Sequence, residues 1–264
     1  MTGRRYARLL GAQARVSIAT VMQYRAELLV EGAMSLVLAA ISLLPLVAFA
    51  ANEATLPGWR FAEMLLVVGL FTVLRGALAA TINPSLLAAV EHIRTGTLDF
   101  VLLKPADAQF LVSTARFAPL KLVDTLAGLG LCAAAFVLLG RSPGPSHLAA
   151  AALLLGAACV VLYSIWILVI SLALWVVRID NLSQLLLAVF EFARWPVTAF
   201  PTLLRILFTF VIPLALMTTY PALALLGRLD LVTGAAALLG AAGLVLGSRR
   251  VWMRALAHYT SASS

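Results

Sequence analysis

The residues of this chain that could carry chemistry are few and widely separated. Its three histidines stand in different segments, and no His-Glu-x-x-His pair is present to hold a metal ion. Its two lysines are followed by Pro105 and Leu122, so the Gly-Lys-Ser/Thr signature of a nucleotide-hydrolysing loop is absent. Nothing resembles the elbow of a serine hydrolase either. The sequence therefore predicts no catalytic residue, no metal site and no cofactor bound by this chain.

Recognition chemistry is instead concentrated in a polar island at residues 91–105, EHIRTGTLDFVLLKP, between two long apolar runs. The island opens on charged residues, including Glu91 and Arg94, and is interrupted at Gly96. Because the neighbouring runs are apolar enough to lie in lipid, the island is where the chain can meet an aqueous partner. We expect it to be a docking element.

A short amphipathic helix is predicted inside this island. Thr97 is a suitable N-cap, and Asp99 falls in the first turn, where the helix dipole favours a carboxylate. Leu98, Val101 and Leu102 share one face at helical spacing. A helix this short is marginal in water and needs a packing partner, which is either another chain or the protein's own spans.

Among the charged residues inside the apolar runs, four are candidates for a functional role: Arg75, Asp124, Glu191 and Arg194. An ionisable group inside a span is energetically costly, so each is a candidate functional residue. Glu191 and Arg194 can pair on one helix face, either as a gate or as a structural pair beside a proline. Arg75 is expected to face the interior and pair with Asp124 or Glu191. Asp124 is also three residues from Lys121, which leaves an interfacial pair as an alternative.

The composition places these residues in a membrane protein. Hydrophobic residues make up 63% of the 264 positions and charged residues 11%, whereas soluble domains carry about 45–50% and about 25%. The net charge of +8 is concentrated at segment ends, which is typical of membrane orientation and argues against nucleic-acid binding. Cys132 and Cys159 fall inside apolar runs and are expected to be core residues, with no disulfide.

Runs of about 20 apolar residues, enough to cross roughly 30 Å of hydrocarbon, predict six spans at 28–51, 62–82, 119–139, 148–177, 182–200 and 231–247. Residues 1–27 precede them as a basic amphipathic helix along the membrane surface, with Arg4, Arg8 and Arg15 on one face. The proline-rich stretch 201–227 is predicted to be a re-entrant or broken hairpin, because interrupted helix at membrane depth needs protein or water around it.

The charges at the two ends decide how many spans there are. If 182–227 crossed twice, seven spans would place the termini on opposite sides. The N-terminal arm carries five arginines and the C-terminal tail three, and the positive-inside rule places both in the cytoplasm. We therefore expect an all-α polytopic protein of the plasma (inner) membrane, with a single transmembrane domain over 1–264 and both termini cytoplasmic.

The island resembles the cytoplasmic coupling segment of ABC-2-type ABC transporter permeases. In that family a coupling helix lies between spans two and three, often introduced by an acidic and basic run and then Gly-Thr-Leu-acidic. The matching residues here are Glu91, Arg94, Gly96, Thr97, Leu98 and Asp99. The stretches 102–113, LLKPADAQFLVS, and 191–201, EFARWPVTAFP, are similar to a subfamily in which two permeases work beside a separate ATPase. His92 and Ile93 stand where stronger charges are common in relatives, so the contacts of this part with an ATPase are expected to differ.

The resemblance implies the permease subunit of an ATP-driven exporter. Its partners would be two copies of a cytoplasmic ATPase, a second, homologous permease and membrane lipid, with ATP and Mg²⁺ bound by the ATPase. The residues that would couple to the ATPase are Glu91, Arg94, Gly96, Thr97, Leu98, Asp99, Phe100, Val101 and Leu102. The alternative is a carrier or channel driven by an ion gradient, which needs buried acids near the midplane, such as Asp124 or Glu191. A membrane scaffold would need neither a cavity nor a coupling helix.

Overall fold

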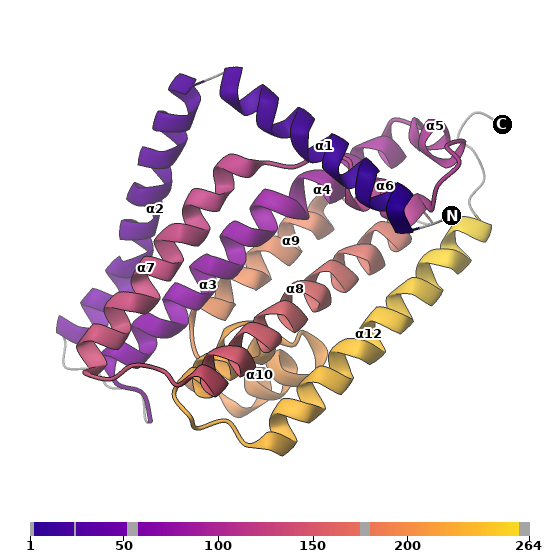
Figure 1. Cartoon of the computed structure of the whole chain (residues 1–264). Coiled ribbons are helices and arrows are strands. Elements are labelled where there is room, and N and C mark those ends of the chain that lie inside the picture. Colours follow the sequence, from indigo (N-terminus) through magenta and orange to yellow (C-terminus); the bar gives the residue numbers. More distant parts are fainter. Residues whose placement is uncertain (1–2, 24, 52–57, 175–179, 259–264) are drawn as a thin grey trace.

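The computed structural model describes residues 3–23, 25–51, 58–174 and 180–258 (Figure 1). In this part of the chain the regular structure is helical and no β-strand occurs, so the predicted all-α class is confirmed. Five helical stretches are long and apolar enough to cross a membrane, and a bent helix pair is a sixth. The five are Leu29–Ala48 within α2 (Arg25–Ala51), α3 (Phe61–Thr81), Pro119–Leu139 comprising η1 (Pro119–Lys121) and α7 (Leu122–Leu139), α8 (Pro145–Ala173) and α12 (Leu231–Ala257).

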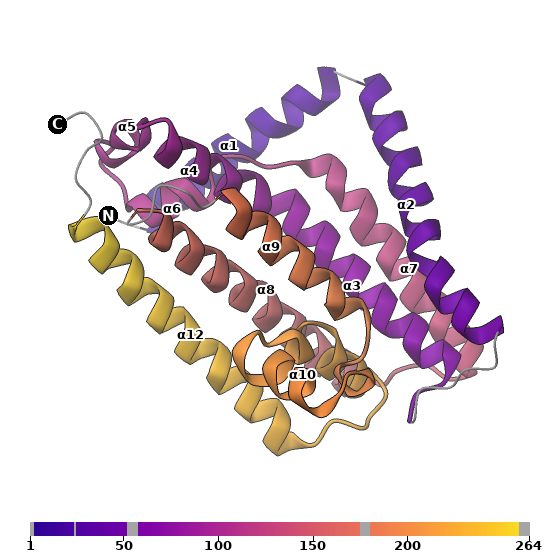
Figure 2. The ribbon, with the colours of Figure 1, turned by 180° about the vertical axis from the view of Figure 1, so that it is seen from behind.

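The long helices run alternately up and down, so the described chain begins and finishes at the same end of the bundle (Figures 1 and 2). That end, called the terminal end below, carries the helix α1 (Gly3–Gln23), which lies across the spans, together with α4 (Asn83–Arg94), α5 (Leu98–Leu102) and α6 (Ala108–Ser113). The opposite end, called the hairpin end, carries the bent pair and the beginnings of α3, α8 and α12. An even number of crossings accommodates this arrangement.

The proline-rich stretch forms the broken hairpin that the sequence predicts. Its arms are Thr202–Val211 and Ala215–Leu225, which meet at an angle of 78° with Pro213 in the break. The first arm contains α10 (Thr202–Ile206) and η4 (Leu207–Val211), and the second contains η5 (Ala215–Thr219) and α11 (Tyr220–Leu225). A proline supplies no N–H to the helix ladder, which explains why the helix breaks at that residue.

The fifth predicted span, 182–200, is not one continuous helix. The structure has α9 (Asp180–Phe190), about 16 Å long for its 11 residues and too short to cross by itself. It is followed by the 3₁₀ turns η2 (Glu191–Arg194) and η3 (Val197–Ala199). Trp195 between them is extended, with φ −107° and ψ 144°, because the residue before a proline avoids the helical region.

The ends of two further spans also differ from the sequence prediction. The last helix continues to Ala257, ten residues beyond the predicted end at 247, and so carries Arg249, Arg250 and Arg254 on its final turns. The fourth begins at Pro145, and its predicted last residues, 175–177, lie outside the described residues. Pro45 does not interrupt α2.

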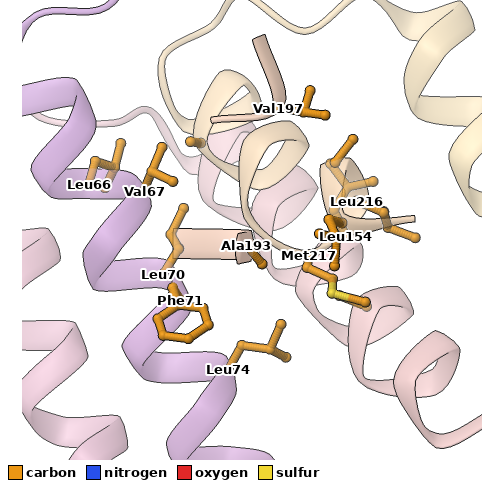
Figure 3. Close-up of a cluster of buried hydrophobic side chains, with 14 of the residues drawn as sticks. Leu66, Val67, Leu70, Phe71, Leu74, Leu154, Ala193, Val197, Leu216 and Met217 are labelled. Carbon is orange, nitrogen blue, oxygen red and sulfur yellow. The ribbon is translucent and has the colours of Figure 1, made fainter. Parts of the chain in front are cut away.

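The helix α3 is the centre of the bundle. Leu66, Val67 and Phe71 are almost fully buried, and Figure 3 shows Leu70, Phe71 and Leu74 of α3 facing the segment that carries Ala193 and Met217. Burial of this helix on nearly all sides restricts where Arg75, the charged residue in its second half, can lie.

The contact between α3 and α7 depends on glycines that the sequence analysis did not single out. A Cβ atom on Gly76 would lie 2.4 Å from the backbone nitrogen of Thr125, and one on Gly128 would lie 2.5 Å from that of Val73. Conversely, Gly243 and Gly247 form a Gly-x-x-x-Gly pattern in α12, but a Cβ atom added at either one would lie within 4 Å of no atom in the described part of the chain. Close helix packing therefore occurs in the first half of the bundle, where small residues let two backbones approach.

Candidate functional site

The turn inside the polar island, residues 91–105, is held by its own polar side chains. Gly96 has a φ of +69°, a conformation that glycine adopts at no steric cost. The Arg94 guanidinium donates to both carboxylate oxygens of Glu91, at 2.9 and 3.0 Å, and this contact lowers the pKa of the Glu91 carboxyl. Thr97 stands at the N-cap position, as predicted, but its hydroxyl contacts His92 Nδ1 at 2.7 Å and Thr95 Oγ1 at 2.9 Å and makes no capping bond.

The short helix α5 has one anchored face and one open face. Leu98 is 0% exposed and belongs to a buried cluster that also contains Ile167 of α8 and Trp252 of α12. Phe100 and Leu103, by contrast, are 69% and 81% exposed. An apolar side chain held out at the end of a bundle, on a helix fixed by its opposite face, is typical of a surface that another protein covers.

A second polar group, absent from the sequence predictions, links the segment after α5 to the spans. We call it the Asp107 cluster, and its members are Tyr6, Asp107, Gln109, Ser113, Tyr163 and Arg249. Asp107 caps α6 by accepting from the Phe110 N–H at 3.0 Å, and Arg249 donates to its two carboxylate oxygens at 3.2 and 2.5 Å. The Arg249 contact holds the pKa of the Asp107 carboxyl below its usual value.

The Asp107 cluster continues from α6 into α8 and reaches α1. Arg249 also donates to Gln109 Oε1 at 2.6 Å, and the Gln109 amide donates to the Tyr163 hydroxyl at 2.9 Å. The hydroxyl of Tyr6 accepts from the Asp107 N–H at 3.3 Å, and its ring packs edge-on against Phe110. Four elements far apart in the chain, α1, α6, α8 and α12, therefore meet next to the polar island.

Two charged residues inside the spans, Arg75 and Arg194, lie beside one aromatic ring, that of Phe71. Glu191 and Arg194 form the ion pair that their spacing predicts. The guanidinium carbons of Arg75 and Arg194 lie 5.8 and 5.6 Å from the centre of the Phe71 ring. The Glu191–Arg194 pair follows the short helix α9, which lies beside α3 in both views (Figures 1 and 2).

Arg75 and Asp124 do not form the ion pairs that the sequence predicts, within the described part of the chain. Within the described residues, neither Asp124 nor Glu191 forms an ion pair with Arg75. Lys121 pairs with Glu31 of α2, which the sequence analysis did not consider, and leaves Asp124 beside a cavity of about 460 Å³ between α2 and α7. Asp124 stands in the first turn of α7, close to the terminal end and away from the bundle centre.

The ion pair between Glu63 and Arg228 at the hairpin end was not predicted from the sequence either. Glu63, whose side chain is 2% exposed, accepts two hydrogen bonds from Arg228 at 3.2 and 2.6 Å and a third from the Arg60 N–H. Arg228 stands three positions before α12 begins. Among the described residues, no three His, Cys, Asp or Glu side chains lie close enough to hold a metal ion.

Comparison with known proteins gives one family. The family described as ABC-2 family transporter protein has a model that matches residues 36–263, which is most of the chain. No curated protein and no solved structure matches it. The matched range includes the polar island, the Asp107 cluster from Asp107 to Arg249 and the charged residues around Phe71.

Proposed function

The chain belongs to the ABC-2 family of transporter proteins, and from that premise we propose that it is the permease subunit of an ATP-driven exporter. It is a multi-pass membrane component and not itself the catalytic subunit of such a transporter. In our proposal a cytoplasmic ATPase, present in two copies, binds ATP and Mg²⁺ and docks on the segment 91–105. A second, homologous permease completes the pathway.

The observation that carries this proposal is the two-faced coupling helix. Leu98 is buried, while Phe100 and Leu103 are exposed at the terminal end. A partner that covers Phe100 and Leu103 removes apolar surface from water, and because α5 is anchored through Leu98, a push on the exposed face is passed to the spans behind it. Exposed arginines at that end, among them Arg250 and Arg254, support its placement in the cytoplasm.

The route from the dock to the spans runs through the Asp107 cluster. When the ATPase dimer closes, α5 is displaced, and α6 follows because only a short loop separates them. Arg249 then carries the displacement into α12, and Gln109 and Tyr163 carry it into α8. We propose that this shift reorients the spans between two access states.

The rival function, a gradient-driven carrier, needs a carboxylate near the midplane that is free to take up and release a coupling ion. Glu191 is engaged by Arg194, and Asp124 lies near the end of its span. The positions of these two carboxylates favour an ATP-driven exporter over a gradient-driven carrier.

Co-purification tests the proposed function. The tagged chain is expressed with the products of its neighbouring genes, extracted in mild detergent and assayed for bound ATPase. The dock variant is Phe100→Glu with Leu103→Glu, which charges the open face and leaves Leu98 in place. The matched control is Met253→Glu, an apolar residue of α12 that is 50% exposed and lies beyond Arg249 and Arg250.

We expect wild type and the control to retain an ATPase with a nucleotide-binding loop and the dock variant to lose it while eluting as the same monodisperse species. Retention of the ATPase by the dock variant would contradict the assigned dock. Absence of any ATPase from the wild-type preparation would overturn the exporter function and make the gradient-driven carrier the working hypothesis.

A further inference from the structure

We infer that the exported substrate is an amphiphile with an anionic group, a carboxylate or a phosphate, which binds to Arg75 and Arg194 beside Phe71. This inference rests on the proposed exporter function, since it names the substrate class of that same pathway. It follows from where the two arginines lie, from the charge that they leave uncompensated and from the aromatic surface next to them.

The guanidinium groups beside Phe71 lie deep in the membrane. Phe71 stands at the middle of α3, which has 21 residues between Phe61 and Thr81. A helix of that length is about 31 Å long and matches the hydrocarbon layer, so its middle residue lies near the bilayer midplane. The guanidinium groups 5.8 and 5.6 Å from the Phe71 ring are therefore at membrane depth.

The two arginines carry more positive charge than the neighbouring carboxylate neutralises. Arginine does not lose its proton inside proteins, so Arg75 and Arg194 both remain cationic. Glu191 neutralises Arg194 through their ion pair, and no carboxylate of the described residues pairs with Arg75. One positive charge is left over at a depth where ionisable groups are costly unless they pair or face water.

The charged side chains at this place are partly exposed. The side chain of Arg194 is 25% exposed, that of Glu191 is 41% exposed, and Arg75 is partly exposed as well. Hydrocarbon is a poor neighbour for three charged groups, so this face of the molecule lines a watery pathway. The outer face of α12 is different, because its large exposed residues between Leu231 and Leu246 are all aliphatic.

A group of aromatic side chains begins next to the charged residues. Next to Arg194, Phe192 of η2 is 46% exposed and stacks on Phe208 at 5.7 Å, and Phe200 packs edge-on against both rings at 6.1 and 5.1 Å. The exposed ring of Phe192, two positions from Arg194 in the chain, supplies an aromatic surface that matches a molecule with an apolar body and an anionic head. A cationic amphiphile would meet a like charge at the same place.

Binding of two matched probes tests the inference. The purified chain is placed in phosphatidylcholine nanodiscs, and dodecyl phosphate or dodecyltrimethylammonium is titrated, with empty nanodiscs giving the partition background. We expect saturable binding of dodecyl phosphate that is about tenfold tighter than that of the cation, and a loss of about tenfold in Arg75→Gln, the size expected for one charge-assisted contact. Arg75→Lys keeps the charge and should retain the preference for phosphate.

Arg141→Gln is the matched control, because Arg141 is an exposed arginine at the hairpin end that donates to the Leu226 carbonyl, away from Phe71. Its affinity for dodecyl phosphate should equal that of wild type. Equal affinity of wild type for the two probes, or an Arg75→Gln variant that binds like wild type, would overturn the inference.

A second lipid composition separates a substrate from a membrane lipid. Addition of phosphatidylglycerol to the nanodiscs leaves the affinity unchanged if the site selects a transported molecule, whereas competition assigns the site to a lipid headgroup and overturns the substrate class. The assay contains no ATPase, so its failure leaves the docking experiment intact, and a failed docking experiment leaves a positive binding result standing.

Discussion

Arg249 of α12 and Asp107, the residue that caps α6, are held together by two hydrogen bonds of 2.5 and 3.2 Å across 142 positions of the sequence. The carboxylate therefore has two tasks, because it also accepts the Phe110 N–H that begins α6. Through this pair the segment behind the proposed dock is joined to the last span.

Replacing Asp107 by asparagine separates these two tasks. Asparagine remains a good N-cap, so α6 should persist, while the charge that holds Arg249 is lost. We expect a loss of about 1 kcal/mol in stability, as is usual for partly exposed pairs, and reduced coupling of ATP hydrolysis to transport. The measurement is ATPase stimulation in reconstituted complexes. A double-mutant cycle with Arg249→Gln checks the pair, and additive effects of the two changes would contradict a direct link.

The same pair predicts an acid-sensitive contribution to stability. Arg249 lowers the pKa of Asp107 from its ordinary 3.8 in the folded protein. A carboxyl group with a lowered folded-state pKa stabilises the fold fully above its unfolded value, and that stabilisation is lost as pH falls below 3.8 through the folded value. Thermal unfolding from pH 6 down to about 3 should show this loss in wild type, and Asp107→Asn should show less of it. A parallel pH dependence in both proteins would contradict the assignment.

Alanine substitutions at three glycines should have opposite outcomes. Gly76→Ala and Gly128→Ala place a methyl group against backbone atoms at 2.4 and 2.5 Å and should cost about 1–3 kcal/mol through overpacking. Gly240→Ala meets no atom within 4 Å and should be neutral or stabilising, since alanine favours helix over glycine. Thermal unfolding in detergent compares the three. If Gly240→Ala proves as damaging as the other two, α12 has a close neighbour in the assembly at that position.

Removing Arg228 should be more damaging than removing its whole ion pair. Glu63 is 2% exposed, and Arg228→Gln leaves its carboxylate buried with one remaining donor, the Arg60 N–H. Loss of one partner of a fully buried pair costs about 3–5 kcal/mol. Because the Arg228 side chain is 45% exposed, the expected cost here is about 1–3 kcal/mol. The double variant Glu63→Gln with Arg228→Gln removes the buried charge and should regain part of that stability. Unfolding temperatures of the single and double variants give the comparison, and a double variant less stable than the single one would refute this electrostatic explanation.

Much of the fold could be predicted from local properties of the sequence. Hydropathy located five of the spans, because about 20 apolar residues are both necessary and visible. The prolines of 201–227 indicated a break in a helix at membrane depth, and the structure has that break at Pro213. The Glu191–Arg194 pair could be found because its partners are one helical turn apart.

What the sequence did not reveal depends on contacts between distant segments. Nothing in the sequence around Asp107 points to Arg249, which is 142 positions away, and Glu63 and Arg228 are likewise 165 positions apart. A pair between Lys121 and the nearby Asp124 was one of the alternatives that the sequence left open, whereas the tertiary fold brings Glu31 to Lys121. The length of α9 was overestimated because Trp195 and Pro196 are apolar, and a hydropathy pattern does not register a lost N–H.

The helix α12 is fastened near both of its ends, to Glu63 through Arg228 at the hairpin end and to Asp107 through Arg249 at the terminal end. An uninterrupted helix of 27 residues behaves as a stiff rod about 40 Å long, and it has no hinge in the middle to absorb a tilt. When such a rod swings about one fastening, the other must come apart. The two arginine pairs thus join the hairpin end of the bundle to the terminal end through α12, so a tilt of this helix about one pair strains the other.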